Sequence, residues 1–281
     1  MQEQDSMKTP DWSGSSGDIW ARRWRDTDRA LDEVGAALDQ AISEVVPPTA
    51  FRALDIGCGP GTSSLSLAVG RPDASILGCD LSQALVAIAR QRAGDLPLLR
   101  FTAEDAEAAA TRYGPFDLIF SRHGVMFFDD PYRAFRTLRG SAARGAAMVF
   151  SCFRSWELNP WASELAAAAA GGPADTPGRE PSGFAFADAD YVRDILHSSG
   201  WQDVEARAVD FHYLAGSGSE PVTQALEFLA ELGPAARIIE GLAPEARDEA
   251  LERMRAVICS YEGEGRVQLP GAAWIWIAKA T

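Results

Sequence analysis

One short run, LDIGCGPGT at residues 54–62, constrains this chain more than any other stretch. Apolar residues come directly before a loop that has glycine at positions 57, 59 and 61. The apolar run suits a buried parallel strand, and glycine allows backbone angles and close approaches that a Cβ forbids. We therefore predict a strand and loop at a cofactor site, with loop amides facing the ligand.

Asp55 is the anomaly in this run, because it places a carboxylate at the end of an apolar strand. A buried carboxylate without partners is strongly unfavourable. We expect Asp55 to accept hydrogen bonds from loop amides, from a cationic group of the ligand, or from both.

The glycine spacing differs from that of the dinucleotide fingerprint GxGxxG, since this chain has GxGxG. Together with Asp55, the loop resembles the first motif of class I S-adenosylmethionine-dependent methyltransferases. The resemblance implies that S-adenosylmethionine is the cofactor. It also implies that Asp55, Gly57, Cys58, Gly59 and Gly61 form part of the cofactor site.

Asp80 ends a second predicted strand, residues 75–79. Doubly wound nucleotide folds place a carboxylate on the ribose hydroxyls about 20 residues beyond the glycine loop. Asp80 is therefore expected to bind the ribose, with Leu81 beside it in the cofactor site. The alternative role for Asp80 is the N-cap of a helix over residues 83–92, although Ser82 can fill that role.

Glu104, Asp105 and Ala106 follow a third predicted strand, residues 98–102. In the methyltransferases that the loop resembles, an acidic residue here accepts a hydrogen bond from the adenine amino group, and Asp105 matches that position. Asp105 or Glu104 also suits the N-cap of the next helix. The two roles are compatible, and all three residues are predicted to bind the cofactor.

The segment SRHGVMFFDDP, residues 121–131, follows a fourth predicted strand, at the end where open α/β sheets bind ligands. Ser121 is assigned to the cofactor site. Met126 and Phe127 are assigned to the substrate pocket, with core packing as the alternative. His123 is the candidate general base, because a neutral imidazole can remove a proton from a nucleophile. The alternatives are that His123 only packs or hydrogen-bonds, and that the reaction needs no base.

The second half of the chain is predicted to complete the sheet and to cover it. Residues 145–153 form a fifth strand, residues 154–187 and 220–261 are helical cap or lid insertions, and residues 188–219 and 262–281 supply the remaining sheet and helix. Pro270 indicates that the final strand begins at an edge or a bulge. Four further candidates for the substrate pocket come from these segments: Trp156, Trp161, Phe186 and Tyr213.

Residues 1–46 are predicted to form an N-terminal helical arm. Residues 1–10 are polar, lack a signal pattern and are expected to be disordered. Trp20 and Trp24 are assigned to the cofactor site, because an aromatic face gains cation-π attraction near a sulfonium. Their alternative role is to dock the arm on the core.

Composition limits the expected partners. With 26 basic and 40 acidic residues the net charge is -14, which opposes nucleic-acid binding. No apolar run approaches the roughly 18 residues of a membrane-spanning helix, so stable membrane insertion is not expected. Four scattered cysteines indicate reduced thiols in a cytoplasmic protein, and no metal site is expected.

Resemblance extends through the runs GVMFFDDP, ELNPWA and FAFADADYVRDILHSSGW, which are similar to those of UbiE-like small-molecule methyltransferases. It implies a single α/β, Rossmann-like domain with seven mostly parallel strands, the last one antiparallel, and helices on both faces. It also implies in-line methyl transfer from S-adenosylmethionine to an N, O or C atom, which leaves S-adenosylhomocysteine.

The abundant aromatic residues favour a small aromatic or apolar acceptor, as in secondary metabolism. The alternatives are a C-methyltransferase of quinone biosynthesis, a non-catalytic protein that binds S-adenosylmethionine, and a nicotinamide enzyme, which the glycine spacing opposes. The expected partners are a small-molecule substrate and, as one option, a second copy of the chain in a homodimer.

Overall fold

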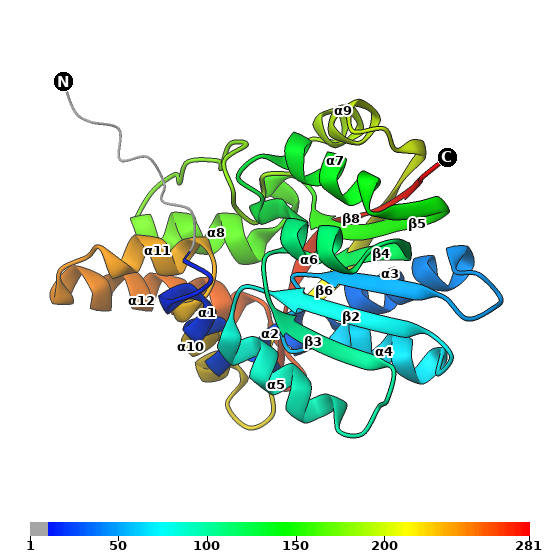
Figure 1. Ribbon diagram of the computed structural model, residues 1–281. Coiled ribbons are helices and arrows are strands. Elements are labelled where there is room, and N and C mark those ends of the chain that lie inside the picture. Colours follow the sequence, from blue (N-terminus) through cyan, green and yellow to red (C-terminus); the bar gives the residue numbers. More distant parts are fainter. Residues whose placement is uncertain (1–10) are drawn as a thin grey trace.

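A computed structural model of the chain describes residues 11–281. Eight strands in this range form one mixed sheet (Figure 1). They are β1 (Arg52–Ile56), β2 (Ser75–Asp80), β3 (Leu99–Ala103), β4 (Phe116–Arg122), β5 (Ala142–Phe153), β6 (Gln202–Ser217), β7 (Glu262–Gly263) and β8 (Arg266–Lys279). The expected disorder of residues 1–10 concerns a segment outside the described residues.

The strand order is β3-β2-β1-β4-β5-β8-β6, and β7 pairs with β8 beside this path. Strands β1 to β5 pair in parallel, and β8 runs antiparallel between β5 and β6. The predicted antiparallel last strand is therefore confirmed. The predicted count of seven strands is wrong, because the chain before β8 folds back as the two-residue strand β7, which is too short to show a hydrophobic period.

Pro270 lies in the part of β8 that extends beyond its pairing with β5. That pairing covers Ala273 to Lys279 of β8, while Pro270 lies opposite His212 of β6. The strand therefore has an open edge at the proline, where a missing N–H breaks no ladder.

Helices cover both faces of the sheet (Figure 1). One face carries α3 (Asp32–Val45), α4 (Thr62–Gly70) and α5 (Gln83–Ala93), and the other carries α6 (Ala106–Tyr113), α7 (Pro131–Gly140) and α9 (Ala189–Ser198). Because both faces are covered, the central strands are almost continuously apolar and buried.

The N-terminal arm consists of three helices, α1 (Ser15–Arg22), α2 (Trp24–Ala30) and α3. The sequence indicates one helical stretch from about residue 18 to 46. The structure breaks it at Arg23 and Leu31, where ψ turns to 14° and 15°. These breaks let α1 and α2 leave the sheet face on which α3 packs.

The cap consists of the turn η2 (Trp156–Leu158) with α8 (Pro160–Ala170), together with α10 (Pro221–Glu231), α11 (Pro234–Glu240) and α12 (Pro244–Ser260). Figure 1 shows α8, α11 and α12 side by side at one side of the sheet. Arg253 of α12 donates to the carbonyl oxygens of Ala168 and Ala169, at 2.7 and 3.0 Å, and so caps the last turn of α8. Two segments distant in sequence thus form one helical layer.

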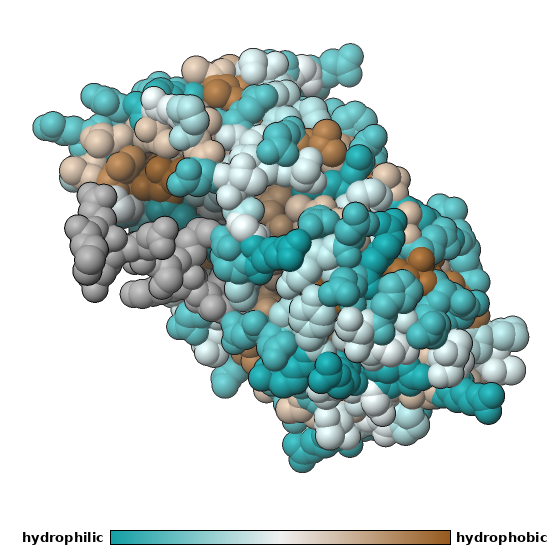
Figure 2. Space-filling view, turned by 90° about the horizontal axis from the view of Figure 1, so that it is seen from above, coloured by the Kyte–Doolittle hydropathy of each residue, from teal (hydrophilic) through white to brown (hydrophobic). Residues whose placement is uncertain are grey.

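The described helices include none that is both long enough and apolar enough to cross a membrane. Figure 2 shows one face of the molecule, on which hydrophilic residues predominate and hydrophobic residues gather in small, separate groups. The high acidic charge of the chain is consistent with this surface.

Asn159 joins the start of α8 to the sheet. Its Nδ2 donates to the carbonyl oxygens of Ser155 and Ala272, at 3.0 and 3.2 Å. Its Oδ1 accepts from the Ala272 amide and from Trp161 Nε1, both at 3.0 Å. The Asn159 side chain is fully buried, so these contacts satisfy groups that water does not reach.

We expect Asn159→Ala to lower the free energy of unfolding by about 2–4 kcal/mol, since each buried polar group left unpaired costs about 1–3 kcal/mol. Ser163→Ala is the control, because Ser163 lies on the same helix and its hydroxyl makes one 3.3 Å contact with the Asn159 carbonyl. Urea denaturation measures both variants. Equal losses in the two would contradict the role assigned to the Asn159 side chain.

Candidate cofactor and substrate site

The glycine loop between β1 and α4 packs closely against the loop after β4 and the end of β2. At Gly57, where φ is +60°, an added Cβ would come within 2.9 Å of Gly124 Cα. The Cys58 amide donates to the Cys79 carbonyl at 3.0 Å, and the Gly59 amide donates to Asp80 Oδ2 at 2.9 Å. The prediction that loop amides face the ligand is therefore wrong for these two amides, since β2 accepts both hydrogen bonds.

Asp80 organises the end of β2. Its Oδ1 accepts from the Ser82 amide at 2.8 Å, and the Ser82 hydroxyl accepts from the Leu85 amide at 3.2 Å as the N-cap of α5. Burial raises the pKa of Asp80, and the amides of Ser82, Gly59 and Leu81 oppose that shift. Because Asp80 lines a cavity and carboxylate oxygens have further lone pairs, it can also accept from hydroxyl groups of a ligand.

Asp105 is the N-cap of α6, as its Oδ1 accepts from the Ala108 amide at 3.0 Å. It lines the same cavity as Asp80, together with Glu104 and Ala106. Glu104 also pairs with Arg112 at 3.4 Å. The predicted N-cap is confirmed, and binding of adenine by Asp105 stays a prediction that this position allows.

Asp55 is 1% exposed and lines the cavity. Its Oδ2 accepts from the Ser64 hydroxyl at 2.6 Å. The expected partners were loop amides, a cationic group of the ligand, or both; the structure supplies a hydroxyl from α4 in place of loop amides, and contact with a ligand stays a prediction. Burial raises the pKa of Asp55 to about 7, while Ser64 and the charge of Arg122 act in the opposite direction.

Asp28 of the arm joins the arm to the sheet. It pairs with Arg122 Nη2 at 2.5 Å and with Arg92 Nη1 at 3.3 Å, and it accepts from the Thr62 hydroxyl at 2.5 Å. These partners come from the end of β4, from α5 and from the start of α4. Asp28 also lines the cavity, so the arm forms part of the cavity wall.

Trp20 and Trp24 both line the cavity. Trp24 lies between the guanidinium groups of Arg25 and Arg92, which are 4.4 and 4.5 Å from its ring centroid. Trp20 contacts Trp12 edge-on, with ring centroids 5.6 Å apart. Docking of the arm is thus a demonstrated role of Trp24, and contact of either ring with the cofactor stays a prediction.

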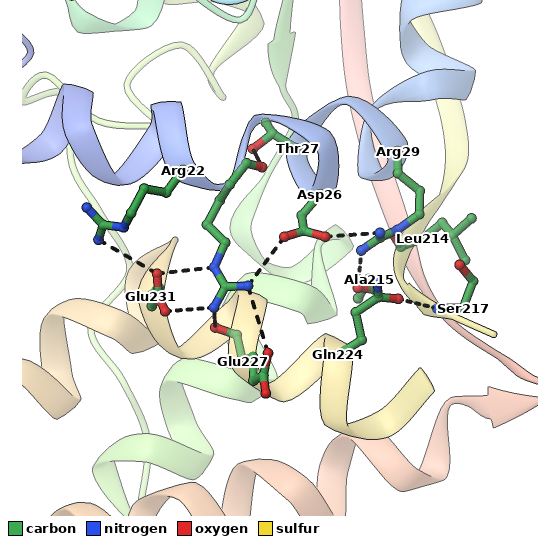
Figure 3. A network of polar contacts seen from close by, with 11 residues as sticks. Arg22, Asp26, Thr27, Arg29, Leu214, Ala215, Ser217, Gln224, Glu227 and Glu231 are labelled. Atoms are coloured by element: carbon green, nitrogen blue, oxygen red, sulfur yellow. Dashed lines mark hydrogen bonds and ion pairs between the residues drawn. The ribbon is translucent and has the colours of Figure 1, made fainter. Parts of the chain in front are cut away.

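A polar network joins the arm to the cap and to β6 (Figure 3). Arg23 makes a two-point contact with Glu231 of α10, at 2.7 and 3.1 Å. Asp26 lies between Arg23 and Arg29, at 3.5 and 3.0 Å, and Arg29 donates to the carbonyl oxygens of Leu214 and Ala215. The position of the cavity wall therefore depends on contacts with α10 and β6.

The cavity lies where β1, β2, β3 and β4 end, and its volume is about 220 Å³. Its acidic residues are Asp28, Asp55, Asp80, Glu104, Asp105, Glu107 and Asp129, and its basic residues are Arg122 and Arg133. This excess of carboxyl groups suits a ligand with a cationic group. The described residues contain no cluster of metal-ligating side chains, and all four cysteines are free thiols.

Gly61 and Ser121 are predicted cofactor residues that do not line the cavity, whereas Gly57, Cys58, Gly59 and Leu81 do. The Ser121 hydroxyl donates to the Ile56 carbonyl at 2.7 Å and accepts from the Gly124 amide at 3.1 Å. An added Cβ at Gly61 would meet the Phe101 ring at 2.7 Å. Both residues therefore shape the loops rather than the cavity surface.

Among the predicted substrate-pocket residues, only Phe127 lines the cavity. Met126 is buried in the core, and Phe186 packs on Phe135 and Phe150. Trp161 stacks on Tyr213 with ring centroids 4.5 Å apart. These side chains and Trp156 belong to the hydrophobic core, because the cap insertions bury their own aromatic residues against the sheet. In the described chain, no residue of 154–187 or 220–261 lines the cavity.

His123 lines the cavity and is 7% exposed. Its Nδ1 lies 2.8 Å from the Ser151 hydroxyl of β5, and its backbone has φ +62°. Burial and the charge of Arg122 lower the pKa of His123 to about 3. A group with this pKa is a weak proton acceptor near neutral pH, which counts against the predicted general base.

The site residues that the sequence analysis missed include Trp12, Asp28, Arg122 and Ser151. Arg122 had a signal, since it is a charged residue at the end of an apolar strand beside His123. Ser151 acts on His123 through the register of β4 and β5, which pairs it with Arg122. Trp12 and Asp28 reach the site through the folding of the arm, which no local pattern shows.

We expect the pH dependence of stability to decrease in Asp55→Asn. A carboxyl group whose pKa rises from 3.8 to about 7 on folding keeps a proton that the unfolded chain has released, so stability falls as the pH rises from about 4 through 7. Asparagine does not titrate. Urea denaturation at pH 5 and pH 8 measures how much the free energy of unfolding falls between these pH values. In Ser64→Ala, which lacks the hydroxyl that lowers the pKa of Asp55, this fall should extend to higher pH. An identical fall of the free energy of unfolding in wild type and Asp55→Asn would contradict the raised pKa of Asp55.

Comparison with known proteins identifies the central segment. Residues 54–150 match the family described as Methyltransferase domain. Trans-aconitate 2-methyltransferase of Variovorax paradoxus is 31% identical over 181 residues, which cover 64% of this chain and 65% of the relative. Malonyl-[acyl-carrier protein] O-methyltransferase 1 of Ilyobacter polytropus is 35% identical over 106 residues, covering 37% of this chain and 38% of the relative. The matches thus span less than two thirds of either relative.

Solved structures share the fold. The YcgJ protein of Bacillus subtilis superposes with a TM-score of 0.55 at 16% identity, covering 87% of this chain and 97% of that chain. Phosphoethanolamine N-methyltransferase 2 of Haemonchus contortus, solved with S-adenosyl-L-methionine, gives 0.53 at 16% identity, covering 97% and 61%. The family match identifies residues 54–150 as a methyltransferase domain, and the mostly parallel sheet around them is shared with these solved structures.

Proposed function

We propose that this chain transfers the methyl group of S-adenosylmethionine to an oxygen atom of a small acceptor with an apolar body. The observation that carries the proposal is one cavity that joins Asp80, Asp105 and the glycine loop to an aromatic wall. The family match supports methyl transfer as the activity.

The residues of the cavity fit the cofactor. Asp80 has lone pairs for the ribose hydroxyls, and Asp105 with Glu104 lies at the end of β3 for the adenine. The excess of carboxyl groups favours the cationic methyl donor over its neutral product. When bound, the cofactor supplies an electrophilic methyl group.

Two observations support the proposed acceptor. Trp12, Trp20, Phe127 and Phe128 form an apolar part of the wall, which suits an apolar or aromatic body. The names of both curated relatives give acceptors that carry carboxylate groups, trans-aconitate and malonyl. Because seven acidic residues line the cavity with two arginines, we propose a monocarboxylate in preference to a tricarboxylate.

The chain's contribution to the reaction is positioning and exclusion of water. The arm covers the ends of the strands, and Asp28 with its three partners holds it there. A covered site keeps donor and acceptor in line and prevents hydration of the attacking oxygen. We propose a small molecule of secondary metabolism as the acceptor, and a homodimer stays an untested option.

We expect Asp80→Asn to weaken S-adenosylhomocysteine binding at least tenfold, about 1.4 kcal/mol, in isothermal titration calorimetry. The variant loses the carboxylate charge that we assign to the ribose. Asp117→Asn is the matched control, because Asp117 accepts from the Arg52 amide and does not line the cavity. Unchanged affinity in Asp80→Asn would refute the ribose assignment.

Methyl transfer itself is tested with labelled S-adenosylmethionine and four acceptor classes: aromatic monocarboxylates, trans-aconitate, hydroquinones and aromatic amines. We expect label to enter the aromatic monocarboxylates as methyl esters, which alkali cleaves. Label on a ring carbon of a hydroquinone, which NMR distinguishes from an equally alkali-stable methyl ether, would favour a quinone-type C-methyltransferase. Binding of S-adenosylhomocysteine without transfer to any class would favour a non-catalytic protein.

A further inference from the structure

His123 is held in an unusual backbone conformation beside β5. Its φ of +62° is rare for a residue with a Cβ. The His123 amide donates to the Ser151 carbonyl at 3.2 Å, and the imidazole packs on Phe153 with ring centroids 4.2 Å apart. Backbone and ring are thus both fixed, so the imidazole has a defined orientation.

The hydrogen bond between Ser151 and His123 decides the tautomer. Ser151 is fully buried, and within residues 11–281 its hydroxyl has one hydrogen-bond partner, His123 Nδ1. If Nδ1 carried the proton, the hydroxyl hydrogen of Ser151 would be buried without an acceptor, which costs about 1–3 kcal/mol. That tautomer would also leave Nε2 unpaired, so two buried groups would lack partners, whereas with Ser151 donating to Nδ1 and the ring proton on Nε2 only the Nε2–H group lacks one.

His123 Nε2 is buried and has no hydrogen-bond partner among the described residues. His123 is among the residues that line the cavity, so a ligand there is a candidate partner for this nitrogen. An N–H group requires an acceptor, such as a carbonyl or carboxylate oxygen. The unpaired nitrogen therefore specifies what kind of atom the ligand presents.

The position of His123 in the sheet separates it from the predicted adenosine residues. Asp80 and Asp105 follow β2 and β3, whereas His123 follows β4 and is bonded to β5. The order β3-β2-β1-β4 places three strand spacings between β3 and β4, about 14 Å at 4.7–4.9 Å each. His123 thus lies on the opposite side of the glycine loop from these residues, where an acceptor can meet the methyl donor.

We propose that Ser151 fixes His123 as the Nε2–H tautomer and that this N–H binds a carbonyl or carboxylate oxygen of the methyl acceptor. The inference rests on the proposed function and deepens it, because it gives the acceptor group that the site recognises. His123 is then a substrate-binding and orienting residue, and it removes no proton.

The chemistry of the acceptor agrees with this role. Carboxylic acids ionise near pH 4, so a carboxylate attacks a methyl group at neutral pH without a base. Burial and the charge of Arg122 keep the ring of His123 uncharged at neutral pH before the acceptor binds. One carboxylate oxygen accepts from Nε2–H while the other attacks, so the contact orients the nucleophile.

The tautomer is measured by nitrogen NMR on protein labelled with ¹⁵N-histidine, without cofactor or turnover. The chain has three histidines, and the signals missing in His123→Gln identify His123. We expect the protonated nitrogen to be Nε2 in wild type and the two tautomers to mix in Ser151→Ala. A proton on Nδ1, or a charged ring at pH 7, would overturn the proposal.

The role is measured by kinetics with the acceptor that the four-class assay selects. Glutamine keeps an N–H donor at Nε2, whereas phenylalanine keeps ring volume and removes the donor. We expect His123→Phe to raise the acceptor KM at least tenfold and His123→Gln to stay within about threefold, with S-adenosylhomocysteine affinity unchanged in both. An equal, large fall of kcat in both variants would show a general base, and wild-type kinetics in both would show a purely structural residue.

The NMR and kinetic measurements distinguish failure of the proposed function from failure of the inference about His123. If wild type binds no S-adenosylhomocysteine, the proposed function fails, and the NMR result still decides the tautomer. If wild type binds and transfers methyl while His123→Phe matches His123→Gln, the proposed function stands and this inference fails.

Discussion

The close approach of two loops, one after β1 and one after β4, is the constraint on which the site depends. Gly57 and Gly124 each lack room for a Cβ, since an added one would come within 2.9 and 2.6 Å of backbone atoms of the other loop or of β1. The Ser121 hydroxyl fixes the contact by joining the Ile56 carbonyl to the Gly124 amide. From β1 the chain continues toward β2, and from β4 toward β5, in opposite directions along the sheet. A crevice forms at such a point, and it separates Asp80 and Asp105 from His123.

Sequence predicted the parts of the site that local chemistry determines. Glycine at 57, a carboxylate at the end of β2 and the N-cap at Asp105 each follow from a few adjacent residues, and all three lie in the cavity wall. Most of the aromatic residues predicted for the substrate pocket do not line the cavity, because tertiary packing places them in the core. Trp161 and Tyr213 are 52 residues apart in sequence and stack on each other in the core, so aromatic content did not indicate a pocket. The strand β7 has two residues and carries no pattern at all.

Buried charge explains why the arm matters for the site. Asp28 brings a carboxylate to Arg122, whose side chain is only 10% exposed and whose charge acts on both Asp55 and His123. An arm that moved away would leave Arg122 without this partner, which is costly for a buried charge. The contacts of Arg23 and Arg29 with α10 and β6 hold the same arm from its other side (Figure 3). The arm is therefore an electrostatic component of the site as well as its cover.

Two titratable groups in the cavity wall are pushed toward their uncharged forms by the same cause, desolvation. Burial raises the pKa of Asp55 to about 7 and lowers that of His123 to about 3, so the acid keeps its proton up to about neutral pH and the base stays unprotonated there. His123 is therefore a poor proton acceptor at neutral pH, whereas Asp55, with a pKa of about 7, exchanges its proton there. An acceptor that arrives already ionised needs no base from His123, and the chain's task is then to hold that acceptor in line with the methyl group.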